Sequence, residues 1–294
     1  MEEDLRPGCV VEIGSLPLER RPKSTPTPGV AAEVASLGDA TGLTRMGVHL
    51  RIVQPGYAGT NRHFHDVEEE WAYVLSGAGH VRISQLSLPV RAGSFVGFVP
   101  GARPHHLLCE GTQPLVLIEG GERRPDEDTF WYPDLRRMAR ARVFLDEYEA
   151  PDEQPGETSQ CVQVSEIEPW HFQHDVEPRA RRTMRTLSKP TGLQRQAVYE
   201  VRVAAGDLTT AFHTHEHTDE WILMLEGIAR ARVGEQAFAV GPGDFLGHPA
   251  GSAPHILEAE TDLVYLVGGN SDPDDVVIYP EAGLRREGGK LGPL

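Results

Sequence analysis

The chain has 294 residues, and its 28 Lys and Arg residues against 44 Asp and Glu residues give a formal net charge of −16. Because the sequence also has no basic cluster to contact phosphates, we expect no nucleic-acid partner. No apolar run approaches the length of a membrane helix. The acidic start and the three cysteines predict a cytoplasmic protein that has neither a secretory signal nor a disulfide framework.

The elements predicted first along the chain are short β-strands separated by turns. A proline-rich arm is expected at residues 20–29, and residues 76–79, Ser-Gly-Ala-Gly, predict a hairpin turn between two strands. Strands are expected at 48–53, 71–75, 80–83, 95–99 and 115–118.

A helix is predicted next, at residues 134–149, where Leu135, Met138, Val143 and Leu145 lie among several arginines. The polar segment 152–158 follows it and predicts a boundary between two domains, residues 1–150 and 151–294. Further strands are expected at 198–203, 221–225, 229–233, 245–247 and 263–267, and the Gly-rich tail after Pro280 is expected to be loosely ordered.

The second half of the chain repeats a set of chemically distinctive residues from the first half, 150 positions later. The two sets are His63, His65, Glu70 and His105, and His213, His215, Glu220 and His255. Shorter matches surround them, including Thr-Gly-Leu-x-Arg at 41–45 and 191–195, and Tyr-Pro at 132–133 and 279–280. The repeat therefore predicts that each half is one domain carrying one copy of the same site.

These residue types favour a metal centre in each domain. Two histidines at positions i and i+2 of a β-strand point to the same face, and three imidazoles with one carboxylate suit a divalent transition metal. Without a metal, buried glutamates and convergent imidazoles would be poorly satisfied. Fe(II) is the favoured ion, with Mn, Ni, Cu and Zn as alternatives.

The spacing resembles the two motifs of the cupin superfamily, and the doubled pattern resembles a bicupin. The first motif corresponds to Gly56 to Gly77 and to Gly206 to Gly227, and the second to Gly93 to His105 and to Gly243 to His255. Six residues rather than the usual five separate the opening glycine from the first histidine. The resemblance implies an all-β fold of two tandem jelly-roll barrels, which the helix at 134–149 would join as a short helical linker.

Three functions remain open at this point. The first is a metal-dependent oxidoreductase, a dioxygenase acting on a small organic molecule, with Glu70 or Glu220 as catalytic base, as resemblance to flavonol dioxygenases implies. The second is a non-oxidative metal enzyme, such as an isomerase, decarboxylase or hydrolase, and the third is a non-enzymatic binding protein. Oxalate decarboxylases of the bicupin type are disfavoured, because Thr60 and Thr210 stand where those enzymes carry an arginine. The overall pattern is also similar to bicupins of unassigned activity.

The remaining expectations concern the surroundings of the two centres. Trp71 and Trp221 follow the glutamates and should face away from the metal as packing residues. His106 and His248 are expected to be structural, and His171, His174 and His217 to lie at the surface or site rim. Positions sharing the inward face predict a small, apolar lining: Asn61, Ala72, Leu107, Ala211, Ile222 and Leu257. The partner is a small-molecule substrate, not a membrane, and the protein is a monomer or a homodimer.

Overall fold

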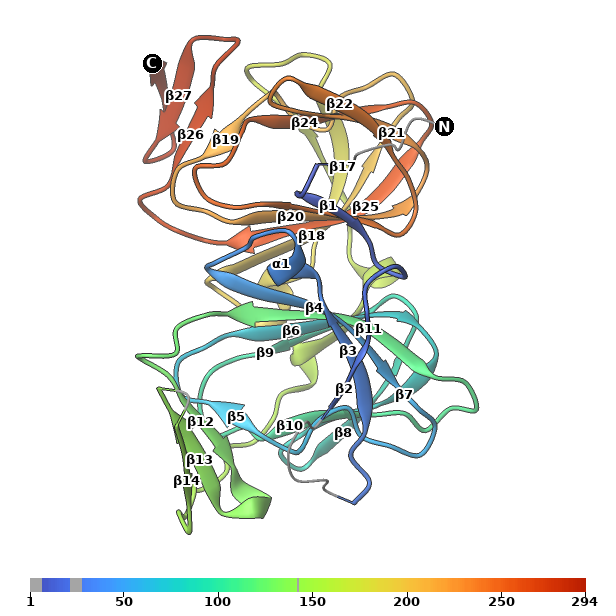
Figure 1. The fold of residues 1–294 in the computed structure, drawn as a ribbon, viewed down its shortest axis with the longest axis vertical. Helices are drawn as coiled ribbons and strands as arrows, with labels where there is room; N and C mark the ends of the chain where they lie inside the picture. Colours follow the sequence, from blue (N-terminus) through green and yellow to red (C-terminus); the bar gives the residue numbers. More distant parts are fainter. Residues whose placement is uncertain (1–6, 22–27, 142) are drawn as a thin grey trace.

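The computed structural model describes residues 7–21, 28–141 and 143–294, and nearly all regular structure in these ranges is β-strand. Two jelly-roll domains lie one above the other in Figure 1, the N-terminal domain below in blue to green and the C-terminal domain above in yellow to red. Each domain is built from one seven-stranded, one three-stranded and one four-stranded sheet, and every pair of neighbouring strands in them is antiparallel. The predicted all-β class and the tandem arrangement are confirmed.

The strands of the N-terminal domain lie in the following spatial order. The seven-stranded sheet is β15 (Cys161–Gln163), β9 (Ser94–Phe98), β6 (Glu70–Ser76), β11 (Leu115–Glu122), β4 (Met46–Val53), β3 (Ala32–Ser36) and β2 (Glu19–Arg21). The three-stranded sheet is β10 (His105–Leu108), β7 (Ala78–Ile83) and β8 (Leu86–Arg91). The four-stranded sheet is β14 (Val143–Asp146), β13 (Arg137–Arg140), β12 (Thr129–Tyr132) and β5 (Phe64–His65).

The C-terminal domain repeats this arrangement. Its seven-stranded sheet is β1 (Val10–Glu12), β23 (Asp244–His248), β20 (Glu220–Glu226), β25 (Leu263–Asn270), β18 (Gln196–Val203), β17 (Arg181–Thr186) and β16 (Trp170–Gln173). The three-stranded sheet is β22 (Gln236–Val240), β21 (Ala229–Val233) and β24 (His255–Ala259). The four-stranded sheet is β19 (Thr214–His215), β26 (Val276–Tyr279), β27 (Leu284–Glu287) and β28 (Lys290–Pro293). The helical elements are short: α1 (Leu37–Ala40), η1 (Pro133–Leu135), η2 (Thr158–Gln160), η3 (Val164–Glu166) and η4 (Lys189–Thr191). No helix in the described ranges is long and apolar enough to span a membrane.

The two domains exchange an edge strand. Strand β1, from the start of the chain, pairs with β23 of the C-terminal domain, and β15, which follows residue 150, pairs with β9 of the N-terminal domain. Figure 1 shows β1 in blue within the upper domain. The division at residues 150 and 151 stays a prediction, and each seven-stranded sheet is completed by a strand from the other half of the chain.

The seven-stranded sheets bury their outer faces against each other. The two faces of β4 have different surroundings. Val48 and Leu50 join the apolar core between the domains, whereas the alternating His49 and Arg51 line the cavity inside their own domain. Trp71 and Trp221 meet at the centre of this core, with parallel-stacked rings 5.0 Å apart. They are 1% and 0% exposed, so the prediction that they are packing residues is confirmed.

The repeated Thr-Gly-Leu-x-Arg segments are held by carboxylates from the opposite domain. Asp219, which is fully buried, accepts hydrogen bonds from the backbone N–H groups of Thr44 and Arg45, both at 2.7 Å. Glu69 does the same for residues 194–196, with N···O distances of 2.9 to 3.2 Å. Each of these acids directly precedes a predicted metal-ligating glutamate, so the interface is tied to both sites through one peptide bond.

The predicted helix at 134–149 is wrong. After η1, this segment forms β13 and β14, which extend the sheet that begins with β5 and β12. Two turn residues with left-handed backbone, Arg136 (φ 50°) and Ala141 (φ 48°), interrupt any helix here. Pairing with β12 therefore overrides the helical spacing of the apolar residues.

Two smaller expectations also fail. Residues 76–79 do not form a hairpin, because β6 and β7 belong to different sheets and Gly77 (φ 85°) turns the chain from one sheet to the other. A Cβ at this glycine would lie 2.3 Å from the carbonyl oxygen of Pro114, which only glycine avoids. The tail after Pro280 is not loose, since β27 and β28 form a hairpin against β26. Most of the expected arm at residues 20–29 lies outside the described residues. The predicted strands are present, and the three cysteines are free.

Candidate metal centres

The N-terminal cluster gathers side chains from three sheets around one carboxylate oxygen. Oε2 of Glu70 lies 3.3 Å from Nε2 of His63, 3.4 Å from Nε2 of His65 and 3.2 Å from Nε2 of His105. A backbone bridge between His63 and His105 places these two rings 4.6 Å apart. All four predicted residues are thus brought together.

The C-terminal cluster has the same construction. Oε2 of Glu220 lies 3.5 Å from Nε2 of His213, 4.0 Å from Nε2 of His215 and 2.7 Å from Nε2 of His255. A bridge between His213 and His255 mirrors the one in the first domain. The structure therefore collects the second predicted set as well.

The outer nitrogens of five of the six histidines, all except His255, have partners that fit a metal centre. Nδ1 of His65 lies 2.6 Å from Asp128, and Nδ1 of His215 lies 2.5 Å from Asp275. Nδ1 of His63 and His213, and of His105, each approach a backbone carbonyl, at 2.8, 2.9 and 3.1 Å. With a metal bound, these contacts would keep the proton on Nδ1 and direct the Nε2 lone pair inward, as in histidines that ligate metals. Nε2 of His65 is buried without a hydrogen-bond partner, which a metal ion would satisfy.

Protonation of the clusters reflects the crowding of these groups. Burial alone would raise the pKa of Glu70, but the surrounding histidines hold it well below the ordinary value, and the same is true of Glu220. Burial opposes protonation of His65, yet Glu70 and Asp128 raise its pKa to about 10, whereas burial lowers the pKa of His255 to about 4. A metal must therefore displace a proton from the His65–Glu70 pair.

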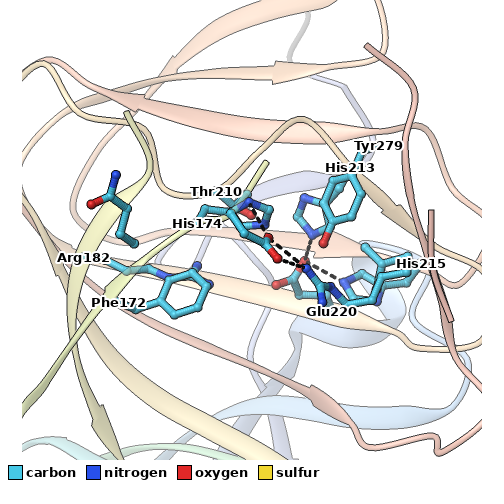
Figure 2. Close-up of a pocket in the computed structure, with 12 residues that line it drawn as sticks. Phe172, His174, Arg182, Thr210, His213, His215, Glu220 and Tyr279 are labelled. Carbon is cyan, nitrogen blue, oxygen red and sulfur yellow. Dashed lines mark hydrogen bonds and ion pairs between the residues drawn. The ribbon is translucent and has the colours of Figure 1, made fainter. Parts of the chain in front are cut away.

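The C-terminal centre opens into a large pocket. His213, His215 and Glu220 form its floor, and the cavity has a volume of about 550 Å³. Figure 2 shows Phe172 and Arg182 on the side of the pocket opposite Tyr279 and His215. The other lining residues are Gln173, His174, Asp175, Thr210, Val277 and Arg286. The clustered histidines and glutamate are thus reachable by a molecule of moderate size.

An aromatic side chain lies beside the N-terminal centre at the place where the C-terminal centre has a valine. Phe130 stacks on the ring of His65 at 4.5 Å and meets His63 edge-on at 4.9 Å. Phe130 lies directly opposite His65 in the pair of strands β12 and β5. In the C-terminal domain the residue opposite His215 is the smaller Val277. The cavity at this centre measures about 190 Å³ and extends into the domain interior. The N-terminal centre therefore has an aromatic ring against two of its histidines and a smaller cavity, although the Glu70 side chain itself is 30% exposed.

The two cavities also differ in how an internal arginine is neutralised. In the N-terminal domain, Arg51 contacts Glu119 at 2.6 Å, and both side chains are largely buried. The C-terminal domain has Val201 and Val267 in its apolar interior instead, and its cavity contains Arg182. The residue 150 positions before Arg182 is Ala32. The two cavities thus receive an inward-facing arginine from different strands, Arg51 from β4 and Arg182 from β17.

Comparison with known proteins agrees with this architecture. Residues 49–120 and 199–268 each match the family model of the cupin domain. The chain is a bicupin of the cupin superfamily. The comparison with curated proteins found no match.

Solved structures similar to this bicupin include several of oxalate decarboxylase. The structure of the Bacillus subtilis enzyme at pH 4.6 is 17% identical, with a TM-score of 0.59 over 90% of this chain and 76% of that chain. A structure of the same enzyme studied for its Mn(II) centres is 17% identical, with a TM-score of 0.58 over 90% and 77%. An oxalate decarboxylase structure that addresses the substrate binding mode is 18% identical, with a TM-score of 0.59 over 90% and 77%. At this level of identity the likeness shows the fold.

Several expectations about the surroundings of the bicupin centres need correction. His174 is not a surface residue, because it is 7% exposed and lines the C-terminal pocket. His248 stacks on His255 with ring centroids 3.5 Å apart, and Phe98 stacks on His105 in the same way in the N-terminal domain. Of the six positions predicted to line a cavity, only Leu107 lines either of the two pockets, and Ala72, Ile222 and Leu257 belong to the cores behind.

The other secondary expectations have mixed outcomes. His171 is exposed, as predicted, and His217 is half-buried, with its backbone N–H bound to Asp275. His106 lines the N-terminal cavity. Sequence reasoning missed Arg182 and Arg286 altogether. Neither arginine lies in a motif, and the position equivalent to Arg182 in the first half of the chain is an alanine. Only the alternation of side chains along β17 could have indicated that Arg182 points inward.

Proposed function

We propose that this bicupin is a metal-dependent enzyme that converts a small organic molecule at its C-terminal centre, with oxidation by dioxygen as the favoured reaction. The observation that carries the proposal is the pocket of about 550 Å³ whose floor is formed by His213, His215 and Glu220. Three histidines and one carboxylate leave coordination positions of a six-coordinate metal open toward that pocket.

In this proposal His213, His215, Glu220 and His255 hold the C-terminal metal, and His63, His65, Glu70 and His105 hold the N-terminal one. A bound divalent metal supplies a Lewis acid and, where it is redox-active, a site for oxygen. Fe(II) is favoured, and Mn, Ni, Cu and Zn remain alternatives. The Bacillus subtilis oxalate decarboxylase with its Mn(II) centres shows that a protein of this fold can hold manganese.

The chain's own groups would prepare the reaction. Asp275 fixes the tautomer and orientation of His215, because it binds Nδ1 at 2.5 Å. The three histidines converge on Oε2 of Glu220, so Oε1 is placed to accept a proton from a bound molecule. Phe172, Val277 and Tyr279 give the pocket apolar walls that exclude water from one side of that molecule. Glu220 would therefore act as both ligand and catalytic base, and Glu70 would do the same only if the N-terminal centre were active.

A non-oxidative reaction, such as decarboxylation, is the second candidate. The positive charge of Arg182 in the same pocket favours it, because a bound carboxylate beside a Lewis acid is the group such a reaction releases. A non-enzymatic binding function would leave both centres loaded and neither turning over. The expected small-molecule partner, the monomer or homodimer and the cytoplasmic location stay predictions.

Metal analysis followed by oxygen uptake tests the proposal. Purified, untagged protein is expected to contain about one transition-metal ion per intact centre, and the matched Glu70→Ala and Glu220→Ala variants to lose metal from one centre each. Oxygen consumption with phenolic, keto or enol compounds should disappear in Glu220→Ala and persist in Glu70→Ala.

The alternatives give different results in the same experiment. Zinc alone with no oxygen uptake, but with release of product from an acid, would replace oxidation by the second candidate. Protein that binds no metal even after reconstitution would contradict both enzymatic functions.

A further inference from the structure

The C-terminal pocket contains a positive charge that the protein itself does not neutralise. Arg182 donates from Nη1 to the carbonyl oxygen of Thr209 at 2.9 Å. Its guanidinium carbon lies 4.7 Å from the centre of the Phe172 ring. Its Nε is buried and has no hydrogen-bond partner, and no carboxylate of the described residues forms an ion pair with it.

The other cations near the two centres are neutralised by protein carboxylates. Arg286, at the rim of the same pocket, contacts both oxygens of Asp175, at 2.6 and 2.8 Å. In the N-terminal cavity Arg51 contacts Glu119 at 2.6 Å. A partly buried guanidinium without a counter-ion is costly, and a ligand that supplies a carboxylate would remove that cost.

A second donor lies beside Arg182. Nδ1 of His174 accepts a hydrogen bond from the backbone N–H of Val176 at 3.1 Å, so the proton of the neutral ring is on Nε2. Burial lowers the pKa of His174 to about 4, which keeps the ring neutral at ordinary pH. Its Nε2–H and the Arg182 guanidinium are thus donors that line the same pocket, and Phe172 and Tyr279 add aromatic surface.

We infer that Arg182 and His174 bind the carboxylate of a small organic acid whose apolar or aromatic body lies between Phe172 and Tyr279 and whose reacting end reaches the metal ligands. This inference deepens the proposed function, because it names the substrate class of the same centre and rests on that centre binding metal. Arg182 is then the residue that selects acids over neutral molecules.

The test is binding to the metal-loaded protein, measured by calorimetry with benzoate and phenylacetate, each compared with its carboxamide. Wild-type protein should bind both acids and prefer them at least about 10-fold over the amides, and Arg182→Gln should weaken acid binding about 10- to 100-fold, as expected for loss of a charge-assisted hydrogen bond. Arg182→Lys should retain most of the affinity, because it keeps the charge.

Arg181→Gln is the matched control, since Arg181 is the neighbouring residue, is exposed and contacts Asp207 outside the pocket. It should bind the acids like wild type. Equal affinity of wild type and Arg182→Gln for the acids, equal affinity of wild type for acids and amides, or no binding of either acid would overturn the inference. The acid-versus-amide comparison needs no variant, so it holds even if Arg182→Gln does not fold. This experiment measures binding and not turnover. A protein that binds the acids but converts no substrate would therefore contradict the proposed function and leave this inference intact.

Discussion

The two metal-ligand clusters of this bicupin have the same four residues, yet their surroundings differ. At the N-terminal centre Phe130 packs against His65, and the small cavity contains an Arg51–Glu119 pair. The C-terminal centre is open beside Val277 and faces Arg182, which has no protein carboxylate as partner in the described part of the chain. Duplicated ligands therefore do not imply duplicated function, and the positions around the ligands distinguish the two centres.

The most severe change should be to place the aromatic ring of the N-terminal centre at the equivalent position of the C-terminal centre. Val277→Phe should lower kcat/KM about 100-fold, because the ring would occupy the space in which a substrate must be positioned. Metal content should not change. Ile278→Trp is the matched control, since it also copies the N-terminal hairpin, at Trp131, but on the neighbouring position of the strand. Full activity in Val277→Phe would contradict the assignment of the pocket.

A second prediction concerns the two equivalent carboxylates that bind backbone N–H groups across the interface between the domains. Asp219→Ala and Glu69→Ala should each lower the free energy of unfolding by about 3 kcal/mol or more, because several backbone N–H groups at the interface would lose a charged acceptor. Urea unfolding measures both. Asp272→Ala is the control, since its 3.7 Å ion pair with Arg45 is partly exposed and should contribute less than about 1 kcal/mol. A large effect of only one of the two acids would show that the interface is less symmetric than its contacts.

The acids behind the histidines should separate metal binding from turnover. Asp275→Asn and Asp128→Asn should each weaken metal binding at their own centre about 10- to 100-fold, because the amide holds the ligating histidine less firmly. Metal titration measures the affinity, and turnover at limiting metal should fall only for Asp275→Asn. Loss of turnover in Asp128→Asn alone would reverse the roles of the two centres.

The smallest change in turnover is expected when the internal ion pair of the N-terminal cavity is replaced. Arg51→Met alone should cost about 3 kcal/mol of stability, because it leaves Glu119 largely buried without its partner. Arg51→Met/Glu119→Leu should be within about 1 kcal/mol of wild type, because neither charge remains, and turnover should be unchanged. A double variant that loses turnover would assign the N-terminal cavity a part in the reaction.

Much of the fold and all eight ligand positions were accessible from the sequence. The i, i+2 histidines specify one strand face, and the recurrence of every ligand at one offset identifies two sites without any structural information. The clusters at Glu70 and Glu220 agree with that pattern, although ligation itself stays a proposal until metal is measured.

The features that distinguish the centres were not accessible in this way. Phe130 and Val277 lie in hairpins outside the motifs, and His174 lies in a segment whose polarity predicted a surface. Strand pairing decides which of these side chains reach a metal centre, and the helical spacing at 134–149 shows how a local pattern misleads when such pairing overrides it. Arg182 has alanine as its counterpart, so comparing the two repeats assigned it no role.

The most direct test of the account is turnover after removal of one centre at a time. His63→Ala/His65→Ala and His213→Ala/His215→Ala should each lose one metal ion and keep the other. The account predicts that the first variant still converts substrate and that the second shows no turnover above the metal-free background. Turnover that survives in the second variant and disappears in the first would contradict it.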